Sequence, residues 1–284
     1  MKTLEDRVQE VLHTNVIKAA SLAGGCVGDV RRLDLEDGRS VVAKIGTGQS
    51  PGLALEGFML RYLAEHSALP VPEVLFADEH LLLMTFLSGG DALSTAAQVD
   101  AARHLAGLHN VTAKEFGFER DTLIGGLLQS NQKEKSWLTF FRDRRLLYMA
   151  HQAHRCGRLP DALLSRIERL CARLEQWIVE PPASSLLHGD MWTGNILVHG
   201  TAISGFVDPA FYYGDPEIEQ AFSTLFGTFG ESFFRRYEEL RPIAPGFFEE
   251  RRDLYNLYPL LVHVRLFGGS YVQSVDHTLR RFGC

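Results

Sequence analysis

The sequence predicts an α+β chain of two lobes, with a small β-rich N-lobe over residues 1–87 and a larger, mainly helical C-lobe over residues 88–284. Two observations predict this division. Short apolar runs bounded by Gly, Pro and Asp fill the first ninety positions, whereas helical periodicity dominates after Ala96. The chain also has 284 residues, 45% of them hydrophobic, which is enough to bury a substantial core.

The N-lobe elements follow from turn residues and periodicity. Residues 3–20 show weak helical periodicity and are expected to form an opening helix. Residues 21–45 predict two strands joined by an Asp-Gly pair at 37–38, because this dipeptide supplies the positive φ of a tight hairpin turn. Residues 53–65 then predict a helix. Residues 70–87 predict two further short strands that follow a proline-bounded loop.

The C-lobe is expected to be built mainly from helices. The helical periodicity covers residues 96–109, 136–155, 162–179, 217–227 and 251–269, with Pro259 interrupting the last segment. Between these helices, residues 185–210 predict short strands that flank polar turns. Two apolar runs there, residues 196–198 and 203–207, are expected to pair as a hairpin.

Charge and hydropathy argue against two classes of partner. The net charge is −6 and basic residues occur only as short Arg pairs, so a nucleic-acid backbone is not an expected ligand. The longest nearly apolar run, residues 81–87, falls well short of the roughly 20 residues that span a bilayer. The N-terminus carries no apolar signal region. We therefore expect a cytoplasmic protein without a membrane partner. The four cysteines are scattered and are expected to be free thiols.

The segment LLHGDMWTGN, residues 186–195, carries the main chemical signal. Asp190 and Asn195 have the D-x-x-x-x-N spacing of a kinase catalytic loop, in which the Asp accepts the proton of the attacking hydroxyl and the Asn binds a metal. Asp208 follows the expected hairpin, which would return it beside Asn195 as a second oxygen ligand for Mg²⁺. The alternative is that these residues only stabilise turns through local hydrogen bonds.

A lysine and a glutamate in the N-lobe fit the same chemistry. Lys44 ends the apolar strand VVAK, the pattern of a strand lysine that reaches the α- and β-phosphates of ATP. Glu56 shares a helix face with Leu53, Leu60 and Leu63, so its carboxylate needs a partner, and Lys44 is the expected one. The alternative is a solvated Glu56 at the margin of this apolar face.

A glycine-bearing turn, LAGGCVGDV, precedes the lysine strand. Gly24, Gly25, Cys26 and Gly28 are predicted to lay backbone N–H groups over ATP phosphates, although the turn departs from G-x-G-x-x-G and alone would indicate only a flexible turn.

Three longer strings carry a family resemblance: LLHGDMWTGNILV, FVDPAFYYGDPEIEQAFSTLFGTF and LYNLYPLLVHVRLFGGSY. With GGCVGDVRRL, VAKI, PVPEVL and SWLTFFRDRRL in the same order, the chain resembles the fructosamine kinase and ketosamine-3-kinase family. That family lies within the kinases similar to aminoglycoside phosphotransferases. The resemblance implies a bilobal protein-kinase-like fold. It also implies ATP and Mg²⁺ as cofactors and a sugar hydroxyl as acceptor, typically O3 of a ketoamine formed by glycation.

The same resemblance implies roles for individual residues. Asp190 would be the base, and Trp192 would lie beside the sugar. Asn195 and Asp208 would bind Mg²⁺, while Lys44 and Glu56 would orient ATP. The hinge that holds adenine would comprise Met84, Thr85 and Leu87, with Thr85 at a position that is commonly acidic in the family.

Other residues near these motifs stay open between two roles. Tyr212 and Tyr213 are expected either to line the sugar pocket or to pack between the lobes. Asp215 is expected to cap the helix that begins near Pro216, with bracing of the catalytic loop as the alternative. His263 could touch substrate, although packing in the core is the stronger interpretation. His188, His104 and His109 are expected to have structural or solvated roles.

Two further functional classes remain as alternatives. One is a kinase for another small hydroxyl acceptor, such as an aminoglycoside or choline. The other is a redox-sensing or catalytically silent kinase-like module. Cys26 is the redox candidate, because a loop that attracts phosphate also stabilises a thiolate. The expected assembly is a monomer, or a homodimer that a Cys26–Cys26 bridge forms under oxidation. The acceptor remains open between a free sugar amine and a glycated protein lysine.

Overall fold

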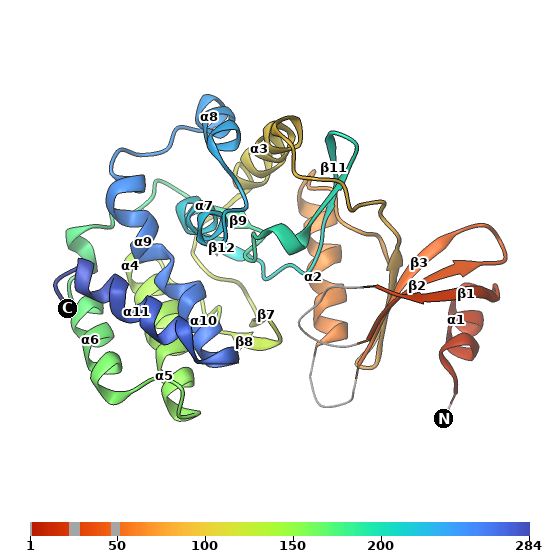
Figure 1. The fold of residues 1–284 in the computed structure, drawn as a ribbon, viewed down its shortest axis with the longest axis horizontal. Helices are drawn as coiled ribbons and strands as arrows, with labels where there is room; N and C mark the ends of the chain where they lie inside the picture. Colours follow the sequence, from red (N-terminus) through yellow and green to blue (C-terminus); the bar gives the residue numbers. More distant parts are fainter. Residues whose placement is uncertain (1, 23–28, 47–51) are drawn as a thin grey trace.

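The computed structural model describes residues 2–22, 29–46 and 52–284 and has the expected α+β architecture (Figure 1). A sheet with its two helices forms one lobe, and a larger group of helices forms the other. The predicted phosphate-binding residues Gly24, Gly25, Cys26 and Gly28 lie outside the described residues. Within the described ranges, no helix is long and apolar enough to cross a bilayer.

The N-terminal sheet contains five antiparallel strands in the order β1-β2-β3-β5-β4. The strands are β1 Val16–Ser21, β2 Asp29–Leu35, β3 Ser40–Ile45, β4 Val74–Ala77 and β5 Leu81–Thr85. Gly38 has a φ of 87° between β2 and β3, so the predicted hairpin is confirmed together with its turn chemistry. The paired strands predicted within residues 70–87 are confirmed as β4 and β5.

The predicted helix over residues 3–20 is wrong in its second half. Helix α1 covers Leu4–Leu12, and His13 ends it in the left-handed conformation with a φ of 55°. The following residues form the edge strand β1, most of whose side chains are exposed. Because β1 buries so little, it lacks the alternation that distinguishes a strand in a sequence.

The two N-terminal helices cover opposite faces of the sheet. Ala43 of β3 packs in a cluster with Val8 of α1, whereas its neighbour Val42 packs with Leu60 of helix α2, Leu53–His66. Side chains alternate along a strand, so Lys44 lies on the same face as Val42. That face is turned toward α2 and the larger lobe (Figure 1).

The C-terminal part is mainly helical, as predicted. Its α-helices are α3 Thr95–His109, α4 Trp137–Phe140, α5 Tyr148–Arg155, α6 Asp161–Cys171, α7 Pro216–Leu225, α8 Glu231–Leu240, α9 Arg252–Tyr255, α10 Leu257–Phe267 and α11 Ser270–Arg281. A π-helical segment, Phe141–Leu147, joins α4 to α5, and another, Phe247–Arg251, leads into α9. The sheet ends at Thr85 and α3 begins at Thr95, so a lobe boundary at residue 87 stays a prediction within this connection.

Two expected helices end or break earlier than their periodicity suggests. The segment 162–179 is helical only as far as Cys171, after which a 3₁₀ turn, Leu174–Gln176, follows. The late helix breaks at Asn256, between α9 and α10. Pro259 therefore lies in the first turn of α10, where its missing N–H costs nothing.

Short strands carry the segment between the helices. They are β6 Thr112–Ala113, β7 Thr122–Ile124, β8 Leu127–Gln129, β9 Ser184–Leu187, β10 Ile196–His199, β11 Ala202–Phe206 and β12 Tyr212–Gly214. The predicted hairpin of β10 and β11 is confirmed. Strand β9 lies between β12 and β6 in a three-stranded sheet. The polar turns that follow β9 and β11 carry the predicted site residues Asp190, Asn195 and Asp208.

Candidate active site

The turn after β9 brings Asp190 and Asn195 into direct contact. The Asn195 Nδ2 donates to the Asp190 carbonyl oxygen over 2.8 Å and to Asp190 Oδ2 over 2.9 Å. A 3₁₀ turn, Thr193–Asn195, closes the loop before β10 begins. The five-residue separation of Asp190 and Asn195 therefore allows the Asn195 amide to hydrogen-bond the Asp190 carboxylate.

Gly189 is required by the shape of this turn. Its φ is 87°, and a Cβ there would lie 2.6 Å from the carbonyl carbon of Ala210. The Ala210 N–H donates to the His188 carbonyl over 2.8 Å, which holds the two segments together. Only glycine combines this backbone conformation with this close approach.

Asp190 has the electrostatic environment of a group that can accept a proton near neutral pH. Burial raises the pKa of Asp190 to about 7, opposed by the hydrogen bond from Asn195 and assisted by the negative charges of Asp208 and Glu219. A general base is most effective when its pKa lies near the working pH.

Lys44 joins the two lobes through carboxylates. Its Nζ lies 2.6 Å from Glu56 Oε1, so the predicted pairing is confirmed, and it also contacts the Asp208 carboxylate. Asp208 follows β11 and has a φ of 54°. The Val207 N–H donates to the Asn195 carbonyl over 3.0 Å, so the hairpin returns Asp208 to the neighbourhood of Asn195.

The charge on Lys44 is maintained by these partners. Burial disfavours the ammonium form, but the charges of Glu56 and Asp208 outweigh it and raise the pKa of Lys44 above its ordinary value. The amine is therefore a fixed cation at the junction of β3, α2 and the turn after β11.

The predicted hinge residues lie at the end of β5 and just beyond it. Met84 is buried in the cluster that includes Leu60, while Thr85 and Leu87 are half-buried. The Thr85 N–H donates to the Glu73 carbonyl over 2.9 Å. A Cβ on Gly205 of β11 would overlap the side chain of Leu87, so the segment after β5 packs directly on the β10–β11 hairpin.

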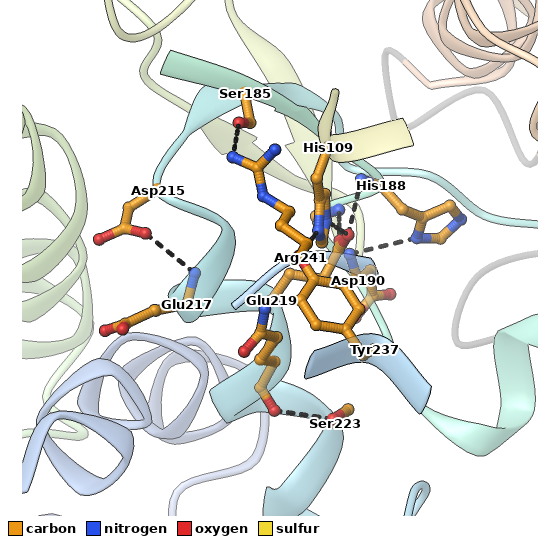
Figure 2. A network of polar contacts seen from close by, with 12 residues as sticks. His109, Ser185, His188, Asp190, Asp215, Glu217, Glu219, Ser223, Tyr237 and Arg241 are labelled. Atoms are coloured by element: carbon orange, nitrogen blue, oxygen red, sulfur yellow. Dashed lines mark hydrogen bonds and ion pairs between the residues drawn. The ribbon is translucent and has the colours of Figure 1, made fainter. Parts of the chain in front are cut away.

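A buried carboxylate that the sequence did not identify holds the turn that leads into Asp190 (Figure 2). Glu219 of α7 accepts from the Gly189 N–H over 2.6 Å and from the His188 N–H over 3.3 Å. It also pairs with His109 Nε2 at 2.8 Å, and His109 Nδ1 lies 2.7 Å from the Tyr237 hydroxyl. Helices α3, α7 and α8 thereby fix the backbone immediately before Asp190.

The anionic form of Glu219 is favoured although its side chain is buried. Burial opposes it, but the hydrogen bond and charge of His109, with the Gly189 N–H, hold the pKa of Glu219 below its ordinary value. The expectation of a structural role for His109 is thus confirmed, with a partner that periodicity alone does not reveal.

Asp215 caps α7, as expected from the Asp-Pro pair. Its side chain accepts from the Glu217 N–H over 3.0 Å and from the Tyr255 hydroxyl over 2.6 Å. The alternative role considered for Asp215 was to brace the loop that carries Asp190. Glu219, one helical turn further along α7, makes that contact instead, through the Gly189 N–H.

If the kinase chemistry predicted from the sequence is correct, replacement of Glu219 by Gln is expected to lower kcat while leaving the KM for ATP nearly unchanged. The amide NH₂ cannot accept from a backbone N–H, so the turn that carries Asp190 loses an anchor. We expect a loss of about 10- to 100-fold, in line with roughly 1.5–3 kcal/mol for a hydrogen bond to a charged group. Steady-state kinetics with thermal unfolding as a folding check measure this effect.

The matched control is Glu217→Gln on the same helix. Glu217 pairs with Arg251, with its Oε2 2.6 Å from Nε, whereas the hydrogen bonds to the His188 and Gly189 N–H groups come from Glu219. We expect kcat of this variant to stay within about two-fold of the unchanged protein. Similar losses in the two variants would show that Glu219 acts on general stability and not on the turn.

A cavity of about 480 Å³ opens beside Asp190. Its lining residues are Ile124, Gly125, Asp190, Trp192, Thr193, Phe222, Phe226, Pro259, Val262, His263, Leu266, Phe267 and Tyr271. The predicted residues Asp190, Trp192 and His263 therefore meet at one cavity. Among the described residues that line this cavity, Asp190 is the one acidic residue.

The two tyrosines of the YYGD turn lie elsewhere. Tyr212 is fully buried in the core, with the Arg145 guanidinium 3.8 Å from its ring centroid. The Tyr213 hydroxyl lies 3.0 Å from that of Tyr62 on α2. Neither tyrosine lines the cavity, and Tyr213 packs between the lobes, the alternative role considered for it.

Aromatic residues that the sequence did not single out form one wall of the cavity. The His263 ring lies 5.1 Å from Phe226 and 4.8 Å from Tyr271, and Phe267 lies 5.7 Å from His263 between ring centroids. Positions 263, 267 and 271 are four residues apart, a spacing that a sequence shows but that does not distinguish a cavity wall from packed core.

His263 has a defined hydrogen-bonding role at this wall. Its Nδ1 lies 2.7 Å from the Pro259 carbonyl, which can only accept, so Nδ1 carries a proton. Burial lowers the pKa of His263, opposed by this same hydrogen bond. The neutral ring therefore keeps Nε2 as an acceptor.

Comparison with known proteins gives a consistent relationship. The family model described as fructosamine kinase matches residues 1–282. A protein of Vibrio parahaemolyticus named "Probable ketoamine kinase" is 34% identical over 235 residues, which are 80% of this chain and 79% of the relative. The chloroplastic protein-ribulosamine 3-kinase of Arabidopsis thaliana is 33% identical over 284 residues, covering 94% of this chain and 84% of the relative.

Solved structures agree with the fold. A Thermobifida fusca protein assigned as a fructosamine-3-kinase superposes with a TM-score of 0.86 at 27% identity, over 98% of this chain and 97% of that one. An aminoglycoside phosphotransferase in ternary complex with ADP and hygromycin B superposes with a TM-score of 0.71 at 18% identity, over 98% of each chain. The second likeness concerns the fold alone.

Proposed function

This chain belongs to the fructosamine kinase family, and from that premise we propose that it transfers the γ-phosphoryl group of ATP to a sugar hydroxyl of a ketoamine, with Asp190 as the base. As a member of this family it is a phosphotransferase that acts on hydroxyl groups. The observation that carries the finer proposal is the position of Asp190 at a cavity with aromatic walls, where the described part of the chain places no second carboxylate in the lining.

The chemistry divides among the described residues. Asp190 orients the acceptor hydroxyl and takes its proton as the new oxygen–phosphorus bond forms and the bond from the γ-phosphorus to the β-phosphate oxygen breaks, so that ADP leaves. Lys44, held by Glu56, offsets the negative charge of the phosphates. The transition state of phosphoryl transfer is loose, so position and charge supply most of the catalysis.

Asn195 and Asp208 fit a cation site with oxygen ligands. The Asn195 Nδ2 is committed to Asp190, which leaves Oδ1 as the atom that would hold Mg²⁺. The Asp208 carboxylate, carried by a left-handed residue after β11, would supply the second protein oxygen. A Mg²⁺ ion held by these two residues would neutralise negative charge that develops on the transferred group.

The lining of the cavity supports a sugar acceptor over a polycation. A sugar ring presents C–H faces that pack on aromatic side chains, and hydroxyls that bind His263 Nε2 and Asp190. Several carboxylates are expected in a pocket that offsets the charge of a polycationic aminoglycoside, whereas Asp190 is the one acidic residue among the described residues of this lining. Names of the relatives, a ketoamine kinase and a ribulosamine 3-kinase, support the same acceptor class.

The test is a substrate panel with Mg-ATP as donor. The panel includes fructosyl-lysine and ribulosyl-lysine derivatives, a glycated protein, kanamycin and choline, and the readout is kcat/KM from ADP release. We expect a ketoamine to be the best acceptor. Faster turnover of kanamycin or choline would favour the alternative, a kinase for another hydroxyl acceptor, and would reject the ketoamine assignment.

Replacement of Trp192 by Ala is expected to raise the KM for the ketoamine about ten-fold, because roughly 1.5 kcal/mol of apolar contact corresponds to that factor. Trp192 lines the cavity, whereas Lys44, which is proposed to contact the phosphates, pairs with Glu56 and Asp208. The KM for ATP is therefore expected to stay unchanged. Kinetics with each substrate varied in turn measure both values, and an unchanged ketoamine KM would argue against Trp192 as part of the acceptor site.

Cys26 remains the redox candidate proposed from the sequence. It lies outside the described residues, so the oxidant sensitivity and the redox-linked homodimer stay predictions. Within the described residues, Lys44, Glu56, Asp190, Asn195 and Asp208 are assembled in one region, which supports an active kinase over a catalytically silent module.

A further inference from the structure

The indole of Trp192 lies directly over Gly194. A Cβ on Gly194 would lie within 2.8 Å of three ring atoms, Cη2, Cζ2 and Cζ3, and real Cβ atoms essentially never approach another heavy atom within 3.0 Å. The ring can therefore occupy this position only when residue 194 has no side chain.

The requirement for glycine at 194 is one of space. Gly194 lies inside the 3₁₀ turn Thr193–Asn195 and is not among the glycines with positive φ. An alanine could adopt its backbone conformation. Gly189 differs, because it needs both a positive φ and a close approach to Ala210.

The backbone around Trp192 is fixed, so the side chain has to absorb any conflict. The Trp192 N–H donates to the Asp190 carbonyl over 3.2 Å, and the Asn195 N–H donates to the Trp192 carbonyl over 3.0 Å. A methyl group on residue 194 would thus rotate the indole away from its place at the cavity and leave the turn itself in register.

We propose that Gly194 is a positioning residue for acceptor binding, acting through Trp192. This inference rests on the proposed function, in which Trp192 borders the acceptor sugar. The Trp-x-Gly spacing within HGDMWTGN then has a physical meaning: the glycine gives the indole a flat backbone surface on which to lie beside Asp190.

The test is a double-mutant cycle with Gly194→Ala, Trp192→Ala and the combined variant. We expect Gly194→Ala to raise the ketoamine KM by about as much as Trp192→Ala, on the order of ten-fold, with the KM for ATP within about two-fold. In the Trp192→Ala background, Gly194→Ala should cause no further change, because the ring that it displaces is gone.

The control is Gly107→Ala on α3. Gly107 is exposed, its φ is not positive and a Cβ there meets nothing within 4 Å, so all kinetic values should stay unchanged. If Gly194→Ala lowers the thermal unfolding midpoint, it should do so only while Trp192 is present, because the overlap involves the indole. The combined variant should then unfold at the same temperature as Trp192→Ala alone, and a clearly lower midpoint for the combined variant would overturn the proposal.

The outcomes separate this inference from the proposed function. Additive effects, with Trp192→Ala raising the ketoamine KM and Gly194→Ala raising it further, would overturn the role of Gly194 and leave the acceptor site intact. If the ketoamine KM is raised in Trp192→Ala but unaltered in Gly194→Ala, the role of Gly194 is likewise overturned and the acceptor site stays intact. An unaltered ketoamine KM in Trp192→Ala would reject the acceptor site together with the inference.

Discussion

Asp190→Asn is expected to bind ATP nearly normally and to lose about 10²- to 10⁴-fold in kcat, the usual contribution of a positioned general base. An asparagine has the size of the aspartate and can keep a hydrogen bond with Asn195, so the turn should remain folded. It cannot take a proton from the acceptor hydroxyl. The ATP contacts proposed for Lys44 lie in the N-lobe, where Lys44 pairs with Glu56, and this substitution does not alter them directly.

The experiment measures turnover of the ketoamine and, separately, the dissociation constant for ATP. Asp161→Asn serves as a control, because it makes the same chemical change at a side chain that is 95% exposed. We expect it to keep full activity. Substantial turnover by Asp190→Asn would reject Asp190 as the base, whereas lost ATP binding would indicate a damaged fold.

Local signals in the sequence predicted most of the N-lobe and the centre of the site. The Asp-Gly turn at 37–38 fixes the β2–β3 hairpin, and its register places Lys44 on the face toward α2. The offset between Asp190 and Asn195 is likewise local, since one short turn brings the two side chains together. Such features depend on neighbouring residues and can be inferred without the tertiary structure.

Contacts between distant segments were harder to predict. His109 and Glu219 are separated by 110 positions, and no periodicity indicates that one helix turns its histidine toward a carboxylate on another. Edge strand β1 was missed because it buries too little to show alternation. The aromatic wall around His263 has the spacing of ordinary core, and only the tertiary structure shows that it borders a cavity.

Tyr212 is a residue that the sequence singled out but whose tertiary contacts could not be predicted. Its motif suggests a substrate contact, yet the residue lies under the buried guanidinium of Arg145, whose Nη2 also donates to Asn131 Oδ1 over 2.7 Å. A buried cation of this kind needs aromatic faces and carbonyl oxygens around it. The sequence identifies the aromatic residue but not which of its possible partners it meets.

Asp208→Ala is expected to raise the Mg²⁺ concentration needed for half-maximal activity and to lower the maximal rate by about 100-fold or more, since a metal ion contributes several kcal/mol of transition-state stabilisation. The change removes one of the two proposed protein ligands and leaves Asn195 alone. It also removes one carboxylate from Lys44, which keeps Glu56 at 2.6 Å and should stay in place.

The measurement is the initial rate at fixed ATP over a range of MgCl₂ concentrations. Asp276→Ala on α11 is the matched control. Like Asp208→Ala, it removes a partly buried carboxylate that pairs with a basic side chain, here with Arg280 Nη2 at 2.6 Å and with Arg166. Its Mg²⁺ titration should follow that of the unchanged protein. A half-saturation point that does not move in Asp208→Ala, even with a lower rate, would contradict metal binding and leave Asp208 as a partner of Lys44 alone.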